Sequence, residues 1–239
     1  MKYVFCICLC LIALSFGVVS AQDVPQNPKV ASVPETLAKK AFEAHGGEKL
    51  KSMSTLTMSG SVDVTSSAAN QAIPAKFLQV FSGEKYRLEI DGGFVQFVQI
   101  FDGVNTVTSP SRGFTLPPIN RVGLMLLQRY GDEGFEITET EEKQKNGFRM
   151  SSPEGYYTDF ILNKKSGRVK SYNSSYFVGG REVTTLVEVD KYSDYEGIII
   201  PTKYAQKFDV SGMTIYAVFK SKTVEVNGEV ADELFLSGE

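Results

Sequence analysis

The sequence LTMSGSVDV, residues 56–64, alternates apolar and polar residues along nearly its whole length. Side chains two positions apart point to the same side of an extended chain, so this stretch predicts a strand with one buried face and one wet face. KYRLEI, residues 85–90, repeats the pattern. These two strands define a mainly β domain, and the rest of the sequence is interpreted outward from them.

Further strands are predicted from apolar or β-branched runs on both sides of these two. They cover residues 75–81, 94–101, 104–108, 135–142, 147–151, 156–162, 169–176, 183–192, 202–210, 213–220 and 223–226. Short glycine-containing turns such as Gly83-Glu84 and Asp102-Gly103 separate many of them, and turns this short join only antiparallel neighbours. We therefore expect about eleven strands, at most thirteen, in one antiparallel sheet, and a sheet so long must curl or close.

Two helices are predicted before the first strand. Ser32-Val33-Pro34-Glu35 matches a capping box with proline in the first turn. Apolar residues then fall on one face until Gly46-Gly47, which supplies the left-handed conformation that ends a helix near His45. A second short turn covers residues 48–53.

A third helix is predicted over RVGLMLLQRY, residues 121–130, with Asn120 as its N-cap and Gly131 at its end. Its apolar residues point nearly all the way round, so it must be covered on most sides. It is either a plug across the open mouth of a curved sheet or an ordinary core helix. Periodicity leaves both alternatives open, because it does not reveal what covers a helix.

The N-terminus resembles a secretory signal. Cys6, Cys8 and Cys10 lie in an apolar run that ends in the small residues Val19-Ser20-Ala21. We expect a signal peptide at 1–21, a flexible leader at 22–31 and a single domain at 32–239. An uncleaved anchor is the alternative, since the run nearly reaches the length that spans a bilayer, but its small-residue end favours cleavage.

Composition argues against several classes of function. The chain has 25 basic and 28 acidic residues without a polybasic block, so nucleic acid is not an expected partner. After removal of the signal it would contain no cysteine and no tryptophan, with His45 as the one histidine. The usual nucleophile, zinc and phosphate-binding motifs are absent. We therefore expect no catalytic residue, no metal and no cofactor.

Three groups of ionisable residues have both a structural and a functional interpretation. His45 beside Gly46-Gly47 would complement the negative end of its helix, which is a structural role. Asp190, Asp194 and Glu196 could hold calcium but lack EF-hand spacing, so a solvated hairpin end is favoured. An acidic edge of Glu139, Glu141 and Glu142 is interpreted as protection of an exposed strand rather than a pair of catalytic carboxylates.

The order of several short motifs resembles a known family. The motifs are AHGGEKL at 44–50, LTMSG at 56–60, KYRLE at 85–89, FDG at 101–103 with Ser109-Pro110, the central apolar helix, DYEGIIIPT at 194–202 and DELF at 232–235. Together they are similar to the LolA-like outer-membrane lipoprotein-sorting proteins of Gram-negative bacteria. The resemblance implies an unclosed, strongly curved antiparallel half barrel, with helices over its concave face and acyl chains held between them. It also implies a periplasmic protein that uses no cofactor and catalyses nothing.

One motif of lipoprotein carriers is replaced. The Arg-Pro pair that precedes the corresponding strand of the family is Ser82-Gly83-Glu84 here, so no gating arginine is carried over. The resemblance therefore implies a lipid, lipoprotein acyl chains or another hydrophobic molecule as ligand, exchanged with inner- and outer-membrane proteins by a monomer. A structural or protein-binding envelope module on the same scaffold is the alternative, followed by an uncharacterised hydrolase.

The predicted ligand cavity is lined by residues on the inward faces of the strands and on the third helix. They are Leu56, Met58, Val62, Tyr86, Leu88, Ile90, Leu124, Leu127, Phe160 and Leu162. A carrier predicts an apolar cavity of several hundred Å³ there. The same residues would also form a dry core, and the sequence does not separate the two.

Overall fold

A computed structural model describes residues 31–67, 71–93, 96–109, 119–178, 181–210 and 213–236. The chain divides into two compact units, Met1–Val30 and Ala31–Glu239. The predicted signal peptide at 1–21 and nearly all of the predicted leader at 22–31 lie outside the described residues. The architecture below is that of the second unit.

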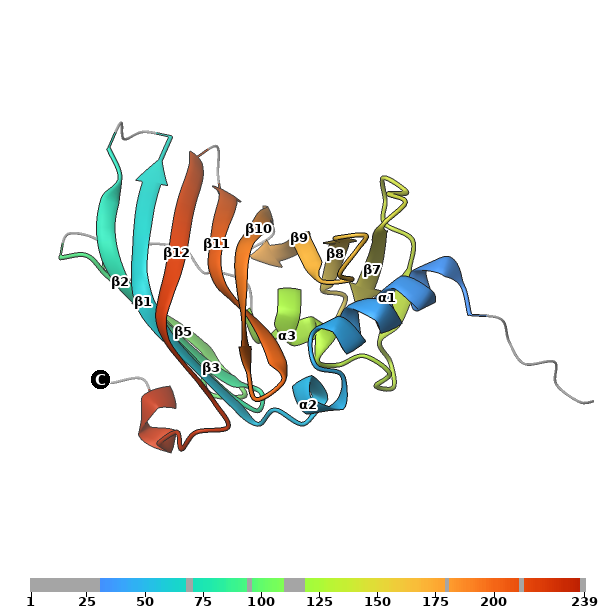
Figure 1. Ribbon diagram of the computed structural model, residues 1–239. Helices are drawn as coiled ribbons and strands as arrows, with labels where there is room; N and C mark the ends of the chain where they lie inside the picture. The colour runs from blue at the N-terminus through green and yellow to red at the C-terminus, as the bar shows by residue number, and fades with distance from the viewer. Residues whose placement is uncertain are drawn as a thin grey trace, which may run out of the picture. The chain divides into compact units, whose positions relative to one another are not determined.

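The second unit is built on one antiparallel sheet of twelve strands (Figure 1). The strands are β1 (Thr55–Ser66), β2 (Ile73–Ser82), β3 (Lys85–Asp91), β4 (Gln96–Phe101), β5 (Thr106–Ser109), β6 (Glu136–Thr138), β7 (Gly147–Ser151), β8 (Tyr157–Leu162), β9 (Val169–Val178), β10 (Arg181–Tyr195), β11 (Ile198–Val210) and β12 (Met213–Val226). Their order is β5-β4-β3-β2-β1-β12-β11-β10-β9-β8-β7-β6. The two outermost strands, β5 and β6, do not pair with each other, so the sheet is not closed into a barrel. The predicted unclosed antiparallel fold is confirmed.

The first and last strands pair at the middle of this sheet, and each half is a meander. The predicted strands 213–220 and 223–226 form a single strand, β12. A bulge explains the apparent break: Ser59 pairs with Thr223 but Gly60 pairs with Ser221, which leaves Lys222 unpaired. Glycine is required at position 60, because a Cβ there would lie 2.1 Å from the Lys220 carbonyl oxygen.

The strand predicted over residues 135–142 is much shorter. β6 ends at Thr138, and the chain then turns, with the Lys143 amide donating to the Thr140 carbonyl and the Gln144 amide donating to the Thr140 hydroxyl. Lys143 has a φ of 49°, which a strand does not contain. Glu141 and Glu142 therefore lie in a loop beyond the edge strand, and the interpretation that they protect a strand edge is wrong.

The first two helices form as predicted. α1 (Val33–Ala44) begins with the full capping box, in which Ser32 and Glu35 exchange hydrogen bonds, and it ends at His45. α2 (Glu48–Lys51) follows Gly47, whose φ is 56°. Burial of Ala38, Ala41 and Phe42 against the sheet supplies the stability that one short helix lacks by itself.

The third helix is shorter than the predicted 121–130. The segment consists of a single 3₁₀ turn, η1 (Ile119–Arg121), and α3 (Gly123–Leu127), followed by turns up to Gly131. Gly123 has a φ of 60°, which breaks the helical path after Arg121. Asn120 does not cap this helix; its side-chain amide donates to the Glu84 carbonyl oxygen at 2.7 Å.

Both helices α1 and α3 lie on the same face of the sheet, called the inner face here, and the sheet curves around them (Figure 1). α1 contacts β6 and β7, whereas α3 contacts β8 and β9. On the opposite, outer face, the C-terminal turn η2 (Asp232–Phe235) buries Phe235 against Val80 and Ile100. Within the described ranges, no helix combines the length and the apolar character needed to cross a bilayer.

Candidate functional site

The ten residues predicted to line a cavity all belong to hydrophobic clusters of the domain. Seven of them are buried in the main core of the inner face, namely Leu56, Met58, Val62, Tyr86, Leu127, Phe160 and Leu162. Ile90 and Leu124 are half-buried and pack against that core. Leu88 lies in a smaller cluster with Phe208.

An apolar cavity of about 80 Å³ lies between α3 and the inner face. Of the ten predicted residues, Leu56, Met58 and Leu124 line it. The other lining residues are Gln79, Phe81, Ile119, Val122, Met125, Tyr172, Thr185, Val187, Ile200, Pro201, Tyr204 and Gln206. Its volume is well below the several hundred Å³ expected from sequence, so in this structure the cavity holds at most a small group rather than an acyl chain.

The polar groups of the cavity all lie on its sheet side, called the polar side here, although apolar side chains of the sheet line that side as well. The lining residues from 119 to 125 are apolar, whereas the sheet contributes the side chains of Gln79, Thr185 and Gln206 beside Leu56, Met58 and Val187. The Gln206 amide donates to the Thr185 hydroxyl at 3.0 Å, and Gln79 accepts from the Tyr204 hydroxyl at 3.2 Å. Each glutamine therefore satisfies one end of its amide within the protein.

Tyr172 contributes a hydroxyl group to the same cavity. Within the part of the chain that the structure describes, this hydroxyl makes no hydrogen bond. Burial raises the pKa of Tyr172 and also that of Tyr204, so both groups stay protonated and uncharged at neutral pH. Tyr172 lines the cavity and is half-buried, so its hydroxyl can hydrogen-bond a ligand or an ordered water there.

Helix α3 covers the cavity because Gly123 lies directly on the Tyr172 ring. A Cβ at position 123 would lie 2.5 Å from the Tyr172 Cζ atom, so only glycine permits this approach. The Gly123 amide donates to the Thr158 hydroxyl at 3.2 Å, and that hydroxyl is also 2.8 Å from the Ser174 hydroxyl. This close contact and this buried hydrogen bond help to position α3, together with the burial of Leu126 and Leu127 in the core.

A second hollow, of about 170 Å³ and called the outer hollow here, lies on the side of Met125 away from the apolar cavity. Leu56, Phe81 and Met125 line both spaces, so these side chains separate the apolar cavity from the outer hollow. The outer hollow is charged: Lys51 pairs with Asp132 at 2.9 Å, and Arg129 pairs with Glu84 at 2.8 Å. A movement of the Met125 side chain would connect the uncharged apolar cavity with the charged outer hollow.

His45 has a structural role, although not by the predicted mechanism. Its Nδ1 atom lies 2.9 Å from the Ile199 carbonyl oxygen, and the Val169 amide donates to its Nε2 atom at 3.1 Å. Because Nε2 accepts, Nδ1 carries the proton and donates. Burial lowers the pKa of His45 and the hydrogen bond to Ile199 raises it. The effect of burial is larger, so the pKa is about 4. The ring is therefore neutral and does not act as a cation at the helix end.

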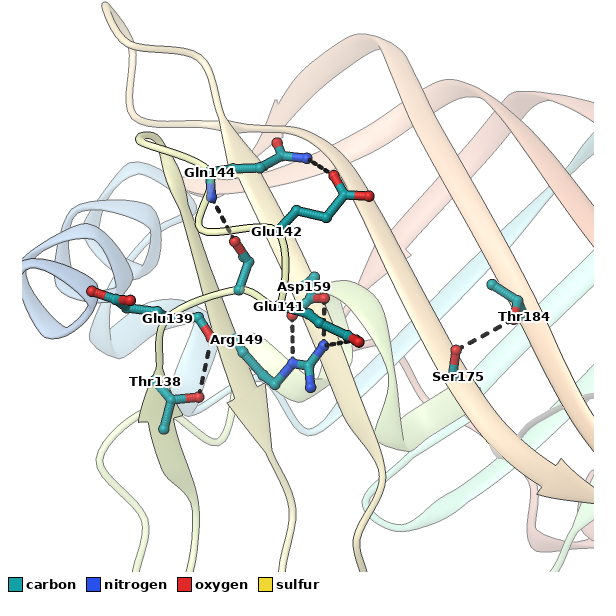
Figure 2. Close-up of polar contacts among 10 residues, drawn as sticks. Thr138, Glu139, Glu141, Glu142, Gln144, Arg149, Asp159, Ser175 and Thr184 are labelled. Atoms are coloured by element: carbon teal, nitrogen blue, oxygen red, sulfur yellow. Dashed lines mark hydrogen bonds and ion pairs between the residues drawn. The ribbon is translucent and has the colours of Figure 1, made fainter.

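A larger hollow, of about 740 Å³, lies on the outer face beside the loop between β6 and β7. Figure 2 shows that two acidic residues that line it, Asp159 and Glu141, contact Arg149: Arg149 binds both carboxylate oxygens of Asp159 at 2.7 Å, and Glu141 lies 3.5 Å away. The Ser175 and Thr184 hydroxyls also pair, at 3.3 Å. The lining contains acidic residues and the lysines Lys170 and Lys207, so this hollow offers no preference for one sign of ligand charge.

The described residues contain no group of three histidine, cysteine or acidic side chains placed to hold a metal ion. Of the acidic residues considered for calcium, Asp194 accepts from the Gly197 amide at 2.7 Å, and Asp190 pairs with Lys203 at 2.5 Å. These contacts are those of a solvated hairpin.

Solved structures are similar to this fold. A LolA superfamily protein from Nitrosomonas europaea superposes with a TM-score of 0.51 at 11% identity, over 87% of this chain and 99% of the other. The chain has a LolA-like fold. Two other structures are less similar: a DUF1329 family protein from Desulfovibrio piger has a TM-score of 0.47 at 9% identity, over 86% of this chain and 98% of that one. An outer membrane lipoprotein-sorting protein domain from Vibrio parahaemolyticus has a TM-score of 0.45 at 10% identity, over 83% of this chain and 97% of that one.

The LolA-like fold is thus recognisable from structure, whereas no family model and no curated protein sequence matches the chain. At such low identity the similarity shows the fold alone. The residues of the cavity must therefore carry any functional argument.

Sequence reasoning missed the polar side of the cavity in this LolA-like domain. The missed signal is a glutamine at the centre of an inward-facing aromatic pattern. It occurs as Phe77-x-Gln79-x-Phe81 in β2, Phe97-x-Gln99-x-Phe101 in β4 and Tyr204-x-Gln206-x-Phe208 in β11. A strand whose buried face contains a polar residue violates simple alternation, and such violations tend to mark functional positions.

Proposed function

We propose that this protein is a periplasmic carrier that binds a hydrophobic ligand between α3 and the inner face of its half barrel. The observation that supports the proposal is the mostly apolar cavity under α3, which is lined by Tyr172, whose hydroxyl has no hydrogen-bond partner among the described residues. Similarity to a LolA superfamily structure is consistent with it. A lipid or lipoprotein acyl chains are the expected ligand classes, and no catalysis is expected.

Loading requires the cavity to enlarge, since about 80 Å³ does not admit a long chain. The shared wall of Leu56, Phe81 and Met125 identifies the direction of enlargement, toward the outer hollow. Methionine has three flexible side-chain bonds and adapts readily to new neighbours. Movement of Met125 together with α3 would join the two spaces.

Mass spectrometry of organic extracts tests the proposal directly. Protein purified from its periplasm without detergent should carry a lipid at near one equivalent. The variant Leu124→Glu places a charge in the cavity wall and should lose the lipid, because a buried charge without a partner is costly. Val104→Glu, at a position that is 82% exposed, is the matched control and should retain it. Repeated absence of lipid from the unmodified protein would contradict the carrier function.

A structural or protein-binding envelope module is the second candidate. The observation that favours it is the small cavity volume, because most of the inner face is filled by the protein's own side chains. This alternative predicts that lipid is absent from the detergent-free protein and that Leu124→Glu changes only stability.

A further inference from the structure

The polar side of the cavity indicates the chemical class of the ligand. Among the described residues, none that lines the cavity has a charged side chain. An anionic group such as a carboxylate or phosphate would lose its hydration there without meeting a cation. An ammonium group would equally lack a carboxylate partner.

Uncharged hydrogen-bonding groups, in contrast, find complementary partners. The Tyr172 hydroxyl is a free donor and acceptor. Gln79 uses its oxygen for Tyr204, which leaves its amide hydrogens as donors. Gln206 uses its amide hydrogens for Thr185, which leaves its oxygen as an acceptor.

The arrangement of these groups also orients a ligand. The polar side chains project from β2, β9, β10 and β11 of the sheet, whereas Ile119, Val122, Leu124 and Met125 face them from η1 and α3. A ligand with one polar edge and one apolar body would match both sides at once.

We propose that the cavity selects an uncharged amphiphile, whose hydroxyl, ester or amide group hydrogen-bonds Tyr172 and the two glutamines. The inference rests on the proposed carrier function and narrows its ligand class. Free fatty acids and anionic phospholipid head groups are excluded from this position, and monoacylglycerol is the simplest ligand of the expected class.

A competition experiment tests the ligand class. Detergent-free protein is incubated at neutral pH with equal amounts of 1-monooleoylglycerol and oleic acid, which share one chain and differ in the head group. Native mass spectrometry then measures the ratio of the two complexes. We expect at least about a tenfold excess of the monooleoylglycerol complex, because no cation lines the cavity and the cations of the outer hollow, Lys51 and Arg129, are already paired with carboxylates. An equal or larger amount of the oleate complex would overturn the inference while leaving the carrier function intact.

A tyrosine variant tests the assigned contact. Tyr172→Phe removes only the hydroxyl and should weaken monooleoylglycerol binding by roughly threefold to tenfold, without changing oleate binding. Tyr192→Phe is the control, since the Tyr192 hydroxyl donates to the Val169 carbonyl oxygen, outside the cavity lining. If Tyr172→Phe does not fold, Gln206→Leu provides the same test.

The possible failures are distinguishable. Unchanged monooleoylglycerol binding by folded Tyr172→Phe would refute the contact assigned to the tyrosine. If neither lipid binds the unmodified protein, the carrier function fails, and the ligand class fails with it.

Discussion

The two ends of the inner face differ in how completely their polar groups are satisfied. Under α1, His45 is fully buried and both ring nitrogens have backbone partners. Under α3, the Tyr172 hydroxyl and one end of each cavity glutamine have no partner among the described residues. Satisfied buried groups fix one conformation, whereas unsatisfied ones leave a site for something else to bind. The α1 end is thus held by satisfied contacts, and the α3 end is where we propose that a ligand binds.

The largest change in stability is expected when His45, at the α1 end, is removed. His45→Ala leaves the Val169 amide and the Ile199 carbonyl buried without partners and also creates a cavity, so we expect a loss of about 3 to 5 kcal/mol in the free energy of unfolding. Urea denaturation measures it. Lys39→Ala, which removes one exposed ion pair on the same helix, should cost less than about 0.5 kcal/mol. A loss below about 1 kcal/mol for His45→Ala would show that α1 is not held by this side chain.

Acid should weaken the same end of the domain. The pKa of His45 is lowered to about 4 in the folded state, against an ordinary value of 6.5. The unfolded chain therefore binds the proton more readily between these values, and stability falls as the pH is lowered through this window. The expected loss is about 3 kcal/mol by pH 4.

Carboxylates titrate in the same range, so a variant is needed to isolate this contribution. His45→Gln keeps a neutral donor and acceptor but does not titrate. The difference between the two pH profiles of unfolding free energy gives the part due to His45. Parallel profiles from pH 7 to pH 4 would contradict a buried neutral imidazole.

At the α3 end, adding a single methyl group at Gly123 should move α3 away from the Tyr172 ring. Gly123→Ala must accommodate a φ of 60° and a clash with the Tyr172 ring, so we expect a loss of about 2 to 3 kcal/mol in unfolding free energy and increased binding of a hydrophobic dye. Gly83→Ala is a matched control: its φ is 55°, but no atom lies within 4 Å of the new Cβ. Equal losses and equal dye binding in the two variants would show that the contact with Tyr172 does not position α3.

The smallest loss of stability is expected from removing a partly exposed ion pair just before α3. Arg121 pairs with Glu154 at 2.8 Å, and both side chains are partly exposed. Arg121→Gln should cost less than about 1 kcal/mol, and the difference from the unmodified protein should shrink further in high salt. A larger, salt-independent loss would indicate that ion pairs rather than packing hold α3.

The sheet was predictable from sequence because its strands bury one face each. Alternation located β1 and β3 correctly, and the short turn at Gly83-Glu84 predicted the antiparallel pairing of β2 with β3. Features of a strand that depend on its neighbouring strand in the sheet were not predictable. The bulge that joins residues 213–226 into one strand arises from the approach of Gly60 in β1, which lies about 160 residues away along the chain.

The candidate site was predictable only in part. Leu56, Met58 and Leu124 line the cavity, but the remaining predicted residues lie in the packed core, because apolar side chains in cores and in cavity walls have the same sequence pattern. The length of α3 was overestimated because the positive φ of Gly123 depends on contact with Tyr172. Gln79 and Gln206 do carry a local signal, the polar residue between two inward aromatic residues.

The position of β1 beside β12 has a consequence for how the domain folds. The contact between Asp63 and Lys220 joins residues 157 positions apart, at the centre of the sheet rather than at its edge. Closing so large a loop is slow, and the two meanders form from local hairpins beforehand. Until they meet, each presents an unpaired strand to other molecules, so we expect a newly synthesised chain to be most prone to aggregation at the edges that later form the β1–β12 pairing.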